Sequence, residues 1–325
     1  MNQDGLPSWR RIVLWGGPHA GKSTLAAAAC VTQFVEVDGG TWQALPGGTD
    51  PEPGIYAELG KLLQEDRLLP DPDLDGETRV RLNLRGTVPV PGPRRTWWQR
   101  RLRGPVPPVA TRDLIARIEL LDRPGDDYRH FVDVRPEDDQ RLSALADADG
   151  LVYVFDPVAE IRRERSNRSY QTRFLRLLRR WAQEENMLRA RNYLPHRIAV
   201  CVTKYDETEV YNQGCVGGFG TQGPDDTRTP RVSDVDAVDY LRWICRQHGA
   251  DDVFAAIRNS FDPERVRYFV TSATGFYVRP GESFDANDHA NVEADGKSIR
   301  GLVRPVNVLE PLIWLAMPYA ETVER

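Results

Sequence analysis

Short apolar runs alternate with longer amphipathic or alanine-rich stretches along most of the chain. This alternation is typical of parallel strands separated by helices. Apolar runs that end in glycine or polar residues predict buried strands at 11–15, 150–157, 196–206 and 265–275. Helical periodicity or alanine content predicts helices at 22–32, 54–69, 138–149, 165–191, 235–249 and 304–317. Strict polar–apolar alternation predicts two more strands, 78–86 and 113–122, paired antiparallel at an edge of the sheet.

These elements together predict an α/β fold with a doubly wound, mostly parallel sheet and one antiparallel edge strand. Four longer stretches interrupt the pattern, at about 38–77, 87–110, 207–232 and 279–300. The first of them begins with the glycine- and proline-rich run 38–53, which predicts a loop. We interpret all four as insertions in a single domain, residues 1–325.

A phosphate-binding pattern stands between the first predicted strand and the first predicted helix. Residues 16–23, GGPHAGKS, match GxxxxGK(S/T). Its glycines let backbone N–H groups turn toward phosphate oxygens, and the helix N-terminus adds partial positive charge. We expect Lys22 to reach the β- and γ-phosphates and Ser23 to hold Mg²⁺. The expected nucleotide contacts here are Gly16, Gly17, Pro18, His19, Ala20, Gly21, Lys22, Ser23 and Thr24. A glycine-capped turn without a ligand is the alternative interpretation.

A second motif ends the 113–122 strand. The letters LLDRPG place Asp122 at the strand end and Gly125 three residues later, which is a DxxG pattern. In that pattern the aspartate reaches magnesium through water and the glycine N–H meets the γ-phosphate. An ordinary Asp-x-Pro-Gly turn has the same letters.

Two further strand ends point to the base of the nucleotide. In VTKYD, residues 202–206, Asp206 can accept two hydrogen bonds from the N1–H and N2–H₂ edge of guanine, a pattern that adenine lacks. Lys204 would lay its stem along the base. Thr203 replaces the asparagine of the NKxD motif and lacks the amide that ties the base loop to the phosphate loop. In TSATG, Ser272, Ala273 and Thr274 follow the last strand, where backbone N–H groups would meet the guanine O6.

The four motifs fall at predicted strand ends in the order found in a Ras-like G domain. Because of these four motifs, the chain resembles translation-factor and Ras-related P-loop GTPases over nearly its whole length. Its insertions and closing helix are similar to bacterial TRAFAC-clade, or double-GTPase-like, domains. The resemblance implies GTP or GDP as ligand, Mg²⁺ as cofactor, hydrolysis by an in-line water and switch segments that read the γ-phosphate. It also implies a switch threonine; Thr78 meets that requirement and joins Ser23 and Asp122 as an expected magnesium ligand.

Hydrolysis is where the chain departs from the Ras-like pattern. Asp126 stands where such an enzyme carries the glutamine that orients water. We expect Lys22, Gly125 and Asp126 to act in catalysis, with slow turnover or a partner that supplies an arginine. Two alternatives stay open: a GTP- or GDP-bound scaffold without useful hydrolysis, and an ATP-dependent P-loop enzyme such as a kinase.

Charge and composition limit the kinds of binding partner that the chain is expected to have. A net charge of −5 gives no electrostatic footprint for nucleic acid or an anionic membrane, and no apolar run is long enough to span one. The insertion 87–110 is rich in Arg, Pro and Trp and predicts a protein-docking loop, so we expect a protein partner at the switch face. Four cysteines without metal-type spacing favour a reducing cytoplasm. The chain has only four lysines, two of them Lys22 and Lys204, which favours special chemistry at those positions.

Overall fold

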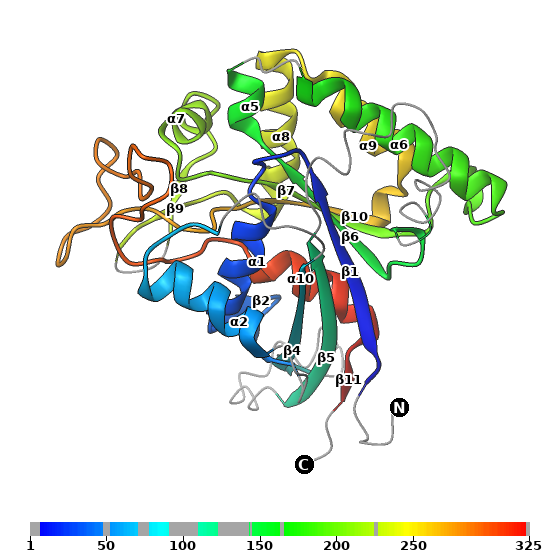
Figure 1. Ribbon diagram of the computed structural model, residues 1–325, viewed down its shortest axis with the longest axis horizontal. Helices are drawn as coiled ribbons and strands as arrows, with labels where there is room; N and C mark the ends of the chain where they lie inside the picture. The colour runs from blue at the N-terminus through cyan, green and yellow to red at the C-terminus, as the bar shows by residue number, and fades with distance from the viewer. Residues whose placement is uncertain are drawn as a thin grey trace, which may run out of the picture.

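The strands that the structure describes form one mixed sheet of nine strands and a separate two-stranded ribbon (Figure 1). It is a computed structural model, and it describes residues 7–47, 53–70, 78–90, 110–122, 143, 145–162, 166–223 and 227–322. Eight strands of the large sheet follow the order β10-β7-β6-β1-β5-β4-β3-β2, and β11 pairs with β5. Their bounds are β1 Trp9–Gly16, β2 Phe34–Val37, β3 Gly40–Pro46, β4 Thr78–Pro89, β5 Thr111–Asp122, β6 Gly150–Phe155, β7 Arg197–Val202, β10 Val266–Val270 and β11 Glu321–Thr322.

The parallel part of the sheet agrees with the sequence. Strands β10, β7, β6, β1 and β5 pair in parallel, and each overlaps one of the expected runs. Strand β6 is buried along its whole length and β7 along all but its first residue. Helices on both faces explain why these strands are continuous apolar runs and not alternating ones.

The antiparallel part is larger than expected. Strands β4 and β5 do pair antiparallel, but they lie inside the sheet, because β3 and β2 continue it beyond β4. The prediction that 38–53 is a loop is therefore wrong over β3. The strand is held by tight packing, since Trp42 is buried against Gly86, where an added Cβ would lie 2.5 Å from the Trp42 ring. The glycine and proline residues at the ends of this short strand predict a loop, so its alternation of buried and exposed residues was not recognised in the sequence.

Helices cover the sheet on both faces (Figure 1). On one face lie α1 Lys22–Val31, α2 Pro53–Gly60, the π-helical turn η1 Lys61–Glu65 and α10 Leu309–Ala316. On the other lie α5 Pro157–Ile161, α6 Ser166–Glu184, α7 Thr208–Val216, α8 Asp234–His248 and α9 Asp251–Ser260. The short 3₁₀ turns are η3 Ala190–Asn192, η4 Pro263–Arg265 and η5 Met317–Tyr319. The two-stranded ribbon is β8 Thr221–Gln222 with β9 Pro230–Arg231.

The helix predictions hold best where the apolar stripe is long. The expected helices at 22–32 and 235–249 match α1 and α8 closely, and the 304–317 stretch contains α10. The predicted 165–191 helix stops earlier, at the end of α6, and α7 and α9 were not predicted. Half of the predicted 138–149 helix, residues 138–142 and 144, lies outside the described residues.

The sheet curves strongly, so its two ends approach each other. Asp38, in the turn between β2 and β3, lies 3.8 Å from the Arg267 guanidinium on β10, which also pairs with Asp234 at 2.8 Å. Yet β2 and β10 stand at opposite ends of the strand order. The curved sheet therefore surrounds the buried faces of α1 and α10, and the carboxyl ends of its parallel strands meet at one edge.

Candidate functional site

The phosphate-loop motif joins β1 to α1 through a tight turn. Gly16 ends β1, and the Ala20 N–H donates to the Gly17 carbonyl at 3.2 Å. Gly21 precedes α1 with a φ of 92°, a left-handed conformation that favours glycine. Glycine has no side chain to cap α1, and a helix N-terminus of this kind favours an anion.

Lys22 lies inside this loop. Its Nζ donates to the carbonyls of Gly16 at 3.3 Å and Gly17 at 2.9 Å, and the side chain is buried. The ammonium is thus held against the loop backbone, in the position that the motif predicts for a group that meets phosphates.

The three predicted magnesium ligands come from three elements and lie together. Ser23 Oγ on α1 donates to Asp122 Oδ2 at the end of β5, at 2.5 Å, and Thr78 pairs with Asp122 in the β4–β5 register. Among the described residues no group of three or more His, Cys, Asp and Glu side chains is placed to hold a metal. One carboxylate with hydroxyls fits Mg²⁺, which usually takes one or two protein carboxylates, water and substrate phosphates. Gly125 and Asp126 lie outside the described residues.

Thr203 connects two loops. One is the VTKYD stretch after β7, residues 202–206, here called the base loop, and the other is the phosphate loop, residues 16–23. Its hydroxyl is 2.9 Å from the Ala20 carbonyl and 3.0 Å from the Phe155 carbonyl, and its side chain is buried. Threonine lacks the amide of the NKxD motif, but its hydroxyl makes a contact with the phosphate loop. The shorter side chain reaches the phosphate loop by donating from its hydroxyl in place of an amide.

Asp156 is a site residue that the sequence analysis missed. Lys204, whose φ is 59°, donates from Nζ to Asp156 Oδ2 at 2.7 Å. The other oxygen of Asp156 caps α5 by accepting from the Val158 N–H at 3.0 Å. The signal was present in the sequence, since Asp156 precedes a proline at a strand end, which is typical of an N-cap. Asp156 thereby fixes where the Lys204 side chain lies.

Asp206 is buried, and both of its carboxylate oxygens accept hydrogen bonds. Ser272 Oγ donates to Oδ1, and Thr274 Oγ1 donates to Oδ2 at 2.8 Å. Burial raises the pKa of Asp206 above its ordinary value, and the two hydroxyl donors oppose that rise. A carboxylate oxygen has two lone pairs, so each oxygen retains the capacity to accept once more.

A cavity of about 500 Å³ joins the phosphate loop to the base motifs. Motif residues line part of it, with Leu25 of α1 beside them: His19, Gly21, Thr24, Thr203, Lys204, Asp206, Thr271, Ala273 and Thr274. Residues from the expected insertions line the rest: Leu62, Leu68, Leu69, Pro70, Glu207, Val292, Gly296 and Lys297. The sequence analysis did not foresee the second group, because no motif marks it.

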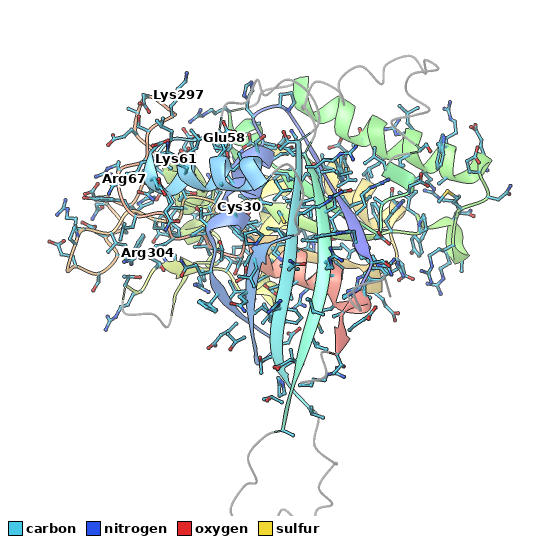
Figure 2. All side chains as sticks on the ribbon, turned by 60° about the horizontal axis from the view of Figure 1, so that its bottom comes forward. Cys30, Glu58, Lys61, Arg67, Lys297 and Arg304 are labelled. Carbon is cyan, nitrogen blue, oxygen red and sulfur yellow. The ribbon has the colours of Figure 1, made fainter. Side chains whose placement is uncertain are left out.

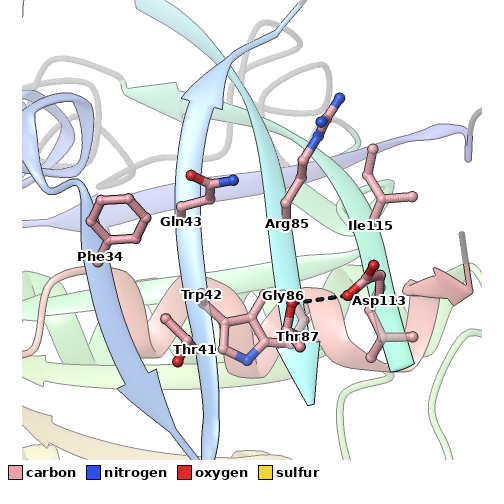
Figure 3. A pocket seen from close by; sticks show the side chains of 10 residues that line it. Phe34, Thr41, Trp42, Gln43, Arg85, Gly86, Thr87, Asp113 and Ile115 are labelled. Atoms are coloured by element: carbon pink, nitrogen blue, oxygen red, sulfur yellow. Dashed lines mark hydrogen bonds between the residues drawn. The ribbon is translucent and has the colours of Figure 1, made fainter. Parts of the chain in front are cut away.

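Another cavity, of about 400 Å³, lies at the antiparallel strands β2 to β5 (Figure 3). Phe34, Gln43, Arg85 and Ile115 stand in one row across these strands, and Thr87 donates to Asp113 at 2.9 Å. None of the motif residues lines this cavity. Residues of the phosphate loop and of both base motifs line only the first of these two cavities.

Two of the expected insertions pack behind the base loop. Tyr205 stands at the x position of the NKxD-like stretch. Its ring lies edge-on to the rings of Tyr240 and Phe276, with centroids 5.9 Å and 5.5 Å away. Tyr211 of α7 in turn contacts His289 at 4.6 Å. Insertions 207–232 and 279–300 therefore support the base loop through a buried aromatic cluster, and their described parts are more than surface loops.

Comparisons with known proteins find only distant likenesses. No protein-family model and no curated protein sequence matches the chain. Among solved structures, Sup35 in complex with GDP aligns at 15% identity and a TM-score of 0.29, over 88% of this chain and 43% of Sup35. The signal recognition particle receptor SRb–GTP/SRX complex from Chaetomium thermophilum aligns at 12% identity and 0.33, over 85% and 95%. The S. cerevisiae Ski7 GTPase-like domain bound to GTP aligns at 13% identity and 0.31, over 86% and 48%.

This chain thus spans less than half of the Sup35 chain that it matches. None of the helices in the described part of the chain is both long and apolar enough to cross a membrane.

Proposed function

We propose that the chain is a magnesium-dependent guanine-nucleotide-binding protein that hydrolyses GTP slowly and acts as a switch for a protein partner. One observation carries the guanine assignment. Asp206 faces the cavity beside the phosphate loop, buried, with each carboxylate oxygen already fixed by one hydroxyl.

The chemistry of Asp206 favours guanine over adenine. A carboxylate only accepts hydrogen bonds, and guanine presents two adjacent donors, N1–H and N2–H₂. Adenine presents one donor beside an acceptor, so it would leave a buried carboxylate oxygen facing a lone pair. Sites that hydrogen-bond one ligand in this way reject the analogue that lacks the donor by large factors.

The phosphate loop and the ends of β4 and β5 would supply the groups that a nucleoside triphosphate requires. Lys22 would exchange its contacts with the Gly16 and Gly17 carbonyls for phosphate oxygens. Ser23, Thr78 and Asp122 would hold Mg²⁺, which when bound neutralises charge on the β- and γ-phosphates. The N-terminus of α1 adds backbone donors to the same phosphates.

The sequence motifs, and not the geometry of the site, support the proposals of slow hydrolysis and of a switch role. Asp126 stands where Ras-like enzymes carry glutamine, and its negative charge would repel a γ-phosphate. We therefore expect turnover to depend on a protein partner. Single-turnover hydrolysis of GTP, with and without cell extract, measures this; a fast rate without extract would contradict it.

Equilibrium binding of fluorescent GTP, GDP and ATP analogues, with Mg²⁺, tests the base assignment. The wild-type chain should prefer GTP over ATP by about a hundredfold or more. Asp206→Asn should reduce GTP binding by about a hundredfold and improve binding of xanthosine triphosphate, whose base has an acceptor where guanine has its amino group. Asp262→Asn is the matched control, because Asp262 caps η4, a turn outside the cavity. An Asp206→Asn variant that keeps its preference for GTP over xanthosine triphosphate would overturn the guanine assignment.

A further inference from the structure

Two insertions that are far apart in the sequence meet at the nucleotide cavity. Leu69 N–H donates to the Lys297 carbonyl at 2.9 Å, and Ile299 N–H donates to the Arg67 carbonyl at 2.8 Å. Between these bonds, Leu68 and Ser298 form an isolated antiparallel bridge. We call residues 62–70 and 292–299 together the cover, and the contact between Leu68 and Ser298 its junction.

Both halves of the cover line the cavity that contains the base motifs. Leu62, Leu68, Leu69 and Pro70 contribute apolar side chains from the first half. Val292, Gly296 and Lys297 line it from the second half. Figure 2 shows Lys61 and Arg67 of the first insertion on the same side of the molecule as Lys297 of the last. In Figure 1 the same loops lie beside α2.

The second half of the cover is fixed to the base site. Asn291 is buried, and its amide donates to the Thr274 carbonyl at 2.9 Å and to the Leu302 carbonyl at 3.3 Å. Its Oδ1 accepts from the Gly301 N–H at 2.9 Å. Thr274, whose hydroxyl donates to Asp206, thus also accepts the hydrogen bond from Asn291 that holds this half of the cover in place.

The first half is fixed to the opposite side, where Leu63 is fully buried in the core that contains α1. The junction between the two halves is only partly buried. It consists of the bridge, its two backbone bonds, a 3.4 Å bond from the exposed Arg67 guanidinium to the Arg300 carbonyl, and Ile299, whose side chain is buried in the same core as Leu63. Leu68 is 40% exposed. Its side of the junction therefore faces solvent, and solvent-exposed hydrogen bonds are typical of the parts of a protein that open most easily.

Resting on guanine-nucleotide binding as proposed above, we propose that the cover closes over the bound nucleoside, with Leu68, Leu69 and Lys297 as added contacts, and that nucleotide enters and leaves only when the junction opens. The apolar residues of the first half shield the base from water. Lys297 brings a cation to the same cavity, held by a turn in which Asp295 accepts from the Lys297 and Ser298 N–H groups at 2.8 Å each.

A reversible crosslink tests this directly. The two backbone bonds flank Leu68 and Ser298, which makes them a non-hydrogen-bonded antiparallel pair. Such pairs have Cα atoms about 4.5 Å apart, within the range that a disulfide bridges. The double variant Leu68→Cys/Ser298→Cys is made in a Cys215→Ser background, because Cys215 is exposed whereas Cys30, Cys201 and Cys245 are buried. Leu68→Cys alone in that background is the matched control.

The measurement is the release rate of a fluorescent GDP analogue after addition of excess unlabelled GDP, and its uptake by nucleotide-free protein. Oxidation should slow both by about tenfold or more in the double variant only, and a reductant should restore them. Equal rates in fully crosslinked and reduced protein would overturn the cover while leaving guanine binding intact. Failure to crosslink under oxidation would contradict the junction. Absence of guanine-nucleotide binding in the parent and reduced proteins would overturn the proposed function, and the cover with it.

Discussion

Replacing Thr203 by valine tests how the base loop and the phosphate loop are coupled. Valine has nearly the shape of threonine but lacks the hydroxyl. The change removes the contacts of Thr203 Oγ1 with the Ala20 carbonyl at 2.9 Å and the Phe155 carbonyl at 3.0 Å. Phe155 keeps a partner, because its carbonyl also accepts from the Thr203 N–H at 3.0 Å. The loss therefore falls mainly on Ala20, in the phosphate loop.

The magnitude follows from these contacts. A typical hydrogen bond contributes about 0.5–1.5 kcal/mol, and a buried acceptor left without its partner costs about 1–3 kcal/mol. Because backbone bonding stays intact, we expect about 1–2 kcal/mol of lost coupling, which corresponds to about 5- to 30-fold weaker binding of GDP.

The assay is equilibrium titration of a fluorescent GDP analogue, together with thermal unfolding of the nucleotide-free protein. Thr32→Val is the matched control, since Thr32 Oγ1 donates to the Ala28 carbonyl at 2.7 Å within the end of α1. That control should lower stability slightly and leave GDP affinity unchanged. If Thr203→Val binds GDP as tightly as the wild type, the hydroxyl does not couple the two loops and the reasoning fails.

Three further changes probe other parts of the site and its support. Thr274→Ala removes a donor that opposes the raised pKa of Asp206, so that pKa should rise further. Guanine binding as proposed requires the ionised carboxylate, so GTP affinity should be lost as pH falls, and in the variant the loss should begin at a higher pH. Titration of GTP binding across about pH 5 to 8 measures this, and superimposable profiles of wild type and variant would refute it. Ser23→Ala should weaken GTP binding by about tenfold in Mg²⁺ and leave it unchanged in chelator; equal loss in both would exclude a metal role for the hydroxyl. Gly275→Ala would place a Cβ 2.0 Å from the Arg304 carbonyl oxygen at a φ of 70°, which should lower stability by about 2 kcal/mol or more in thermal unfolding. Gly281→Ala, at a φ of 79° with nothing within 4 Å, should lower it by only about 1 kcal/mol, and an equal effect of both changes would contradict the close contact.

The sequence predicted the parallel strands and the positions of the motifs well. Each motif follows a run of apolar residues, and a strand buried on both faces requires such a run. Glycine at positions 16 and 21 and lysine at position 22 are recognisable because the GxxxxGK(S/T) pattern specifies a residue type at each of these positions. In the structure Ser23 donates to Asp122, and Thr78 pairs with Asp122 in the β4–β5 register.

The antiparallel strands and the supporting residues were harder to predict. Strand β3 has only seven residues, and its flanking glycine and proline residues resemble a loop. Its stability comes from Trp42 packing on Gly86, a contact between residues 44 positions apart, which no local pattern reports. For Asp156 the sequence indicated only a helix cap, whereas in the structure its carboxylate also accepts a hydrogen bond from Lys204.

The sequence by itself therefore determined the local properties of the protein: which segments become parallel strands or long helices, and which residue types stand at the strand ends. Only the tertiary structure decided which partners those residues meet. The contacts of Thr203 with Ala20, of Asp206 with Ser272 and Thr274, and of Arg67 with Ile299 join residues 66 or more positions apart. Periodicity and motif spacing depend on neighbours in the chain, whereas such hydrogen bonds depend on how the curved sheet places the ends of distant strands and insertions beside one another.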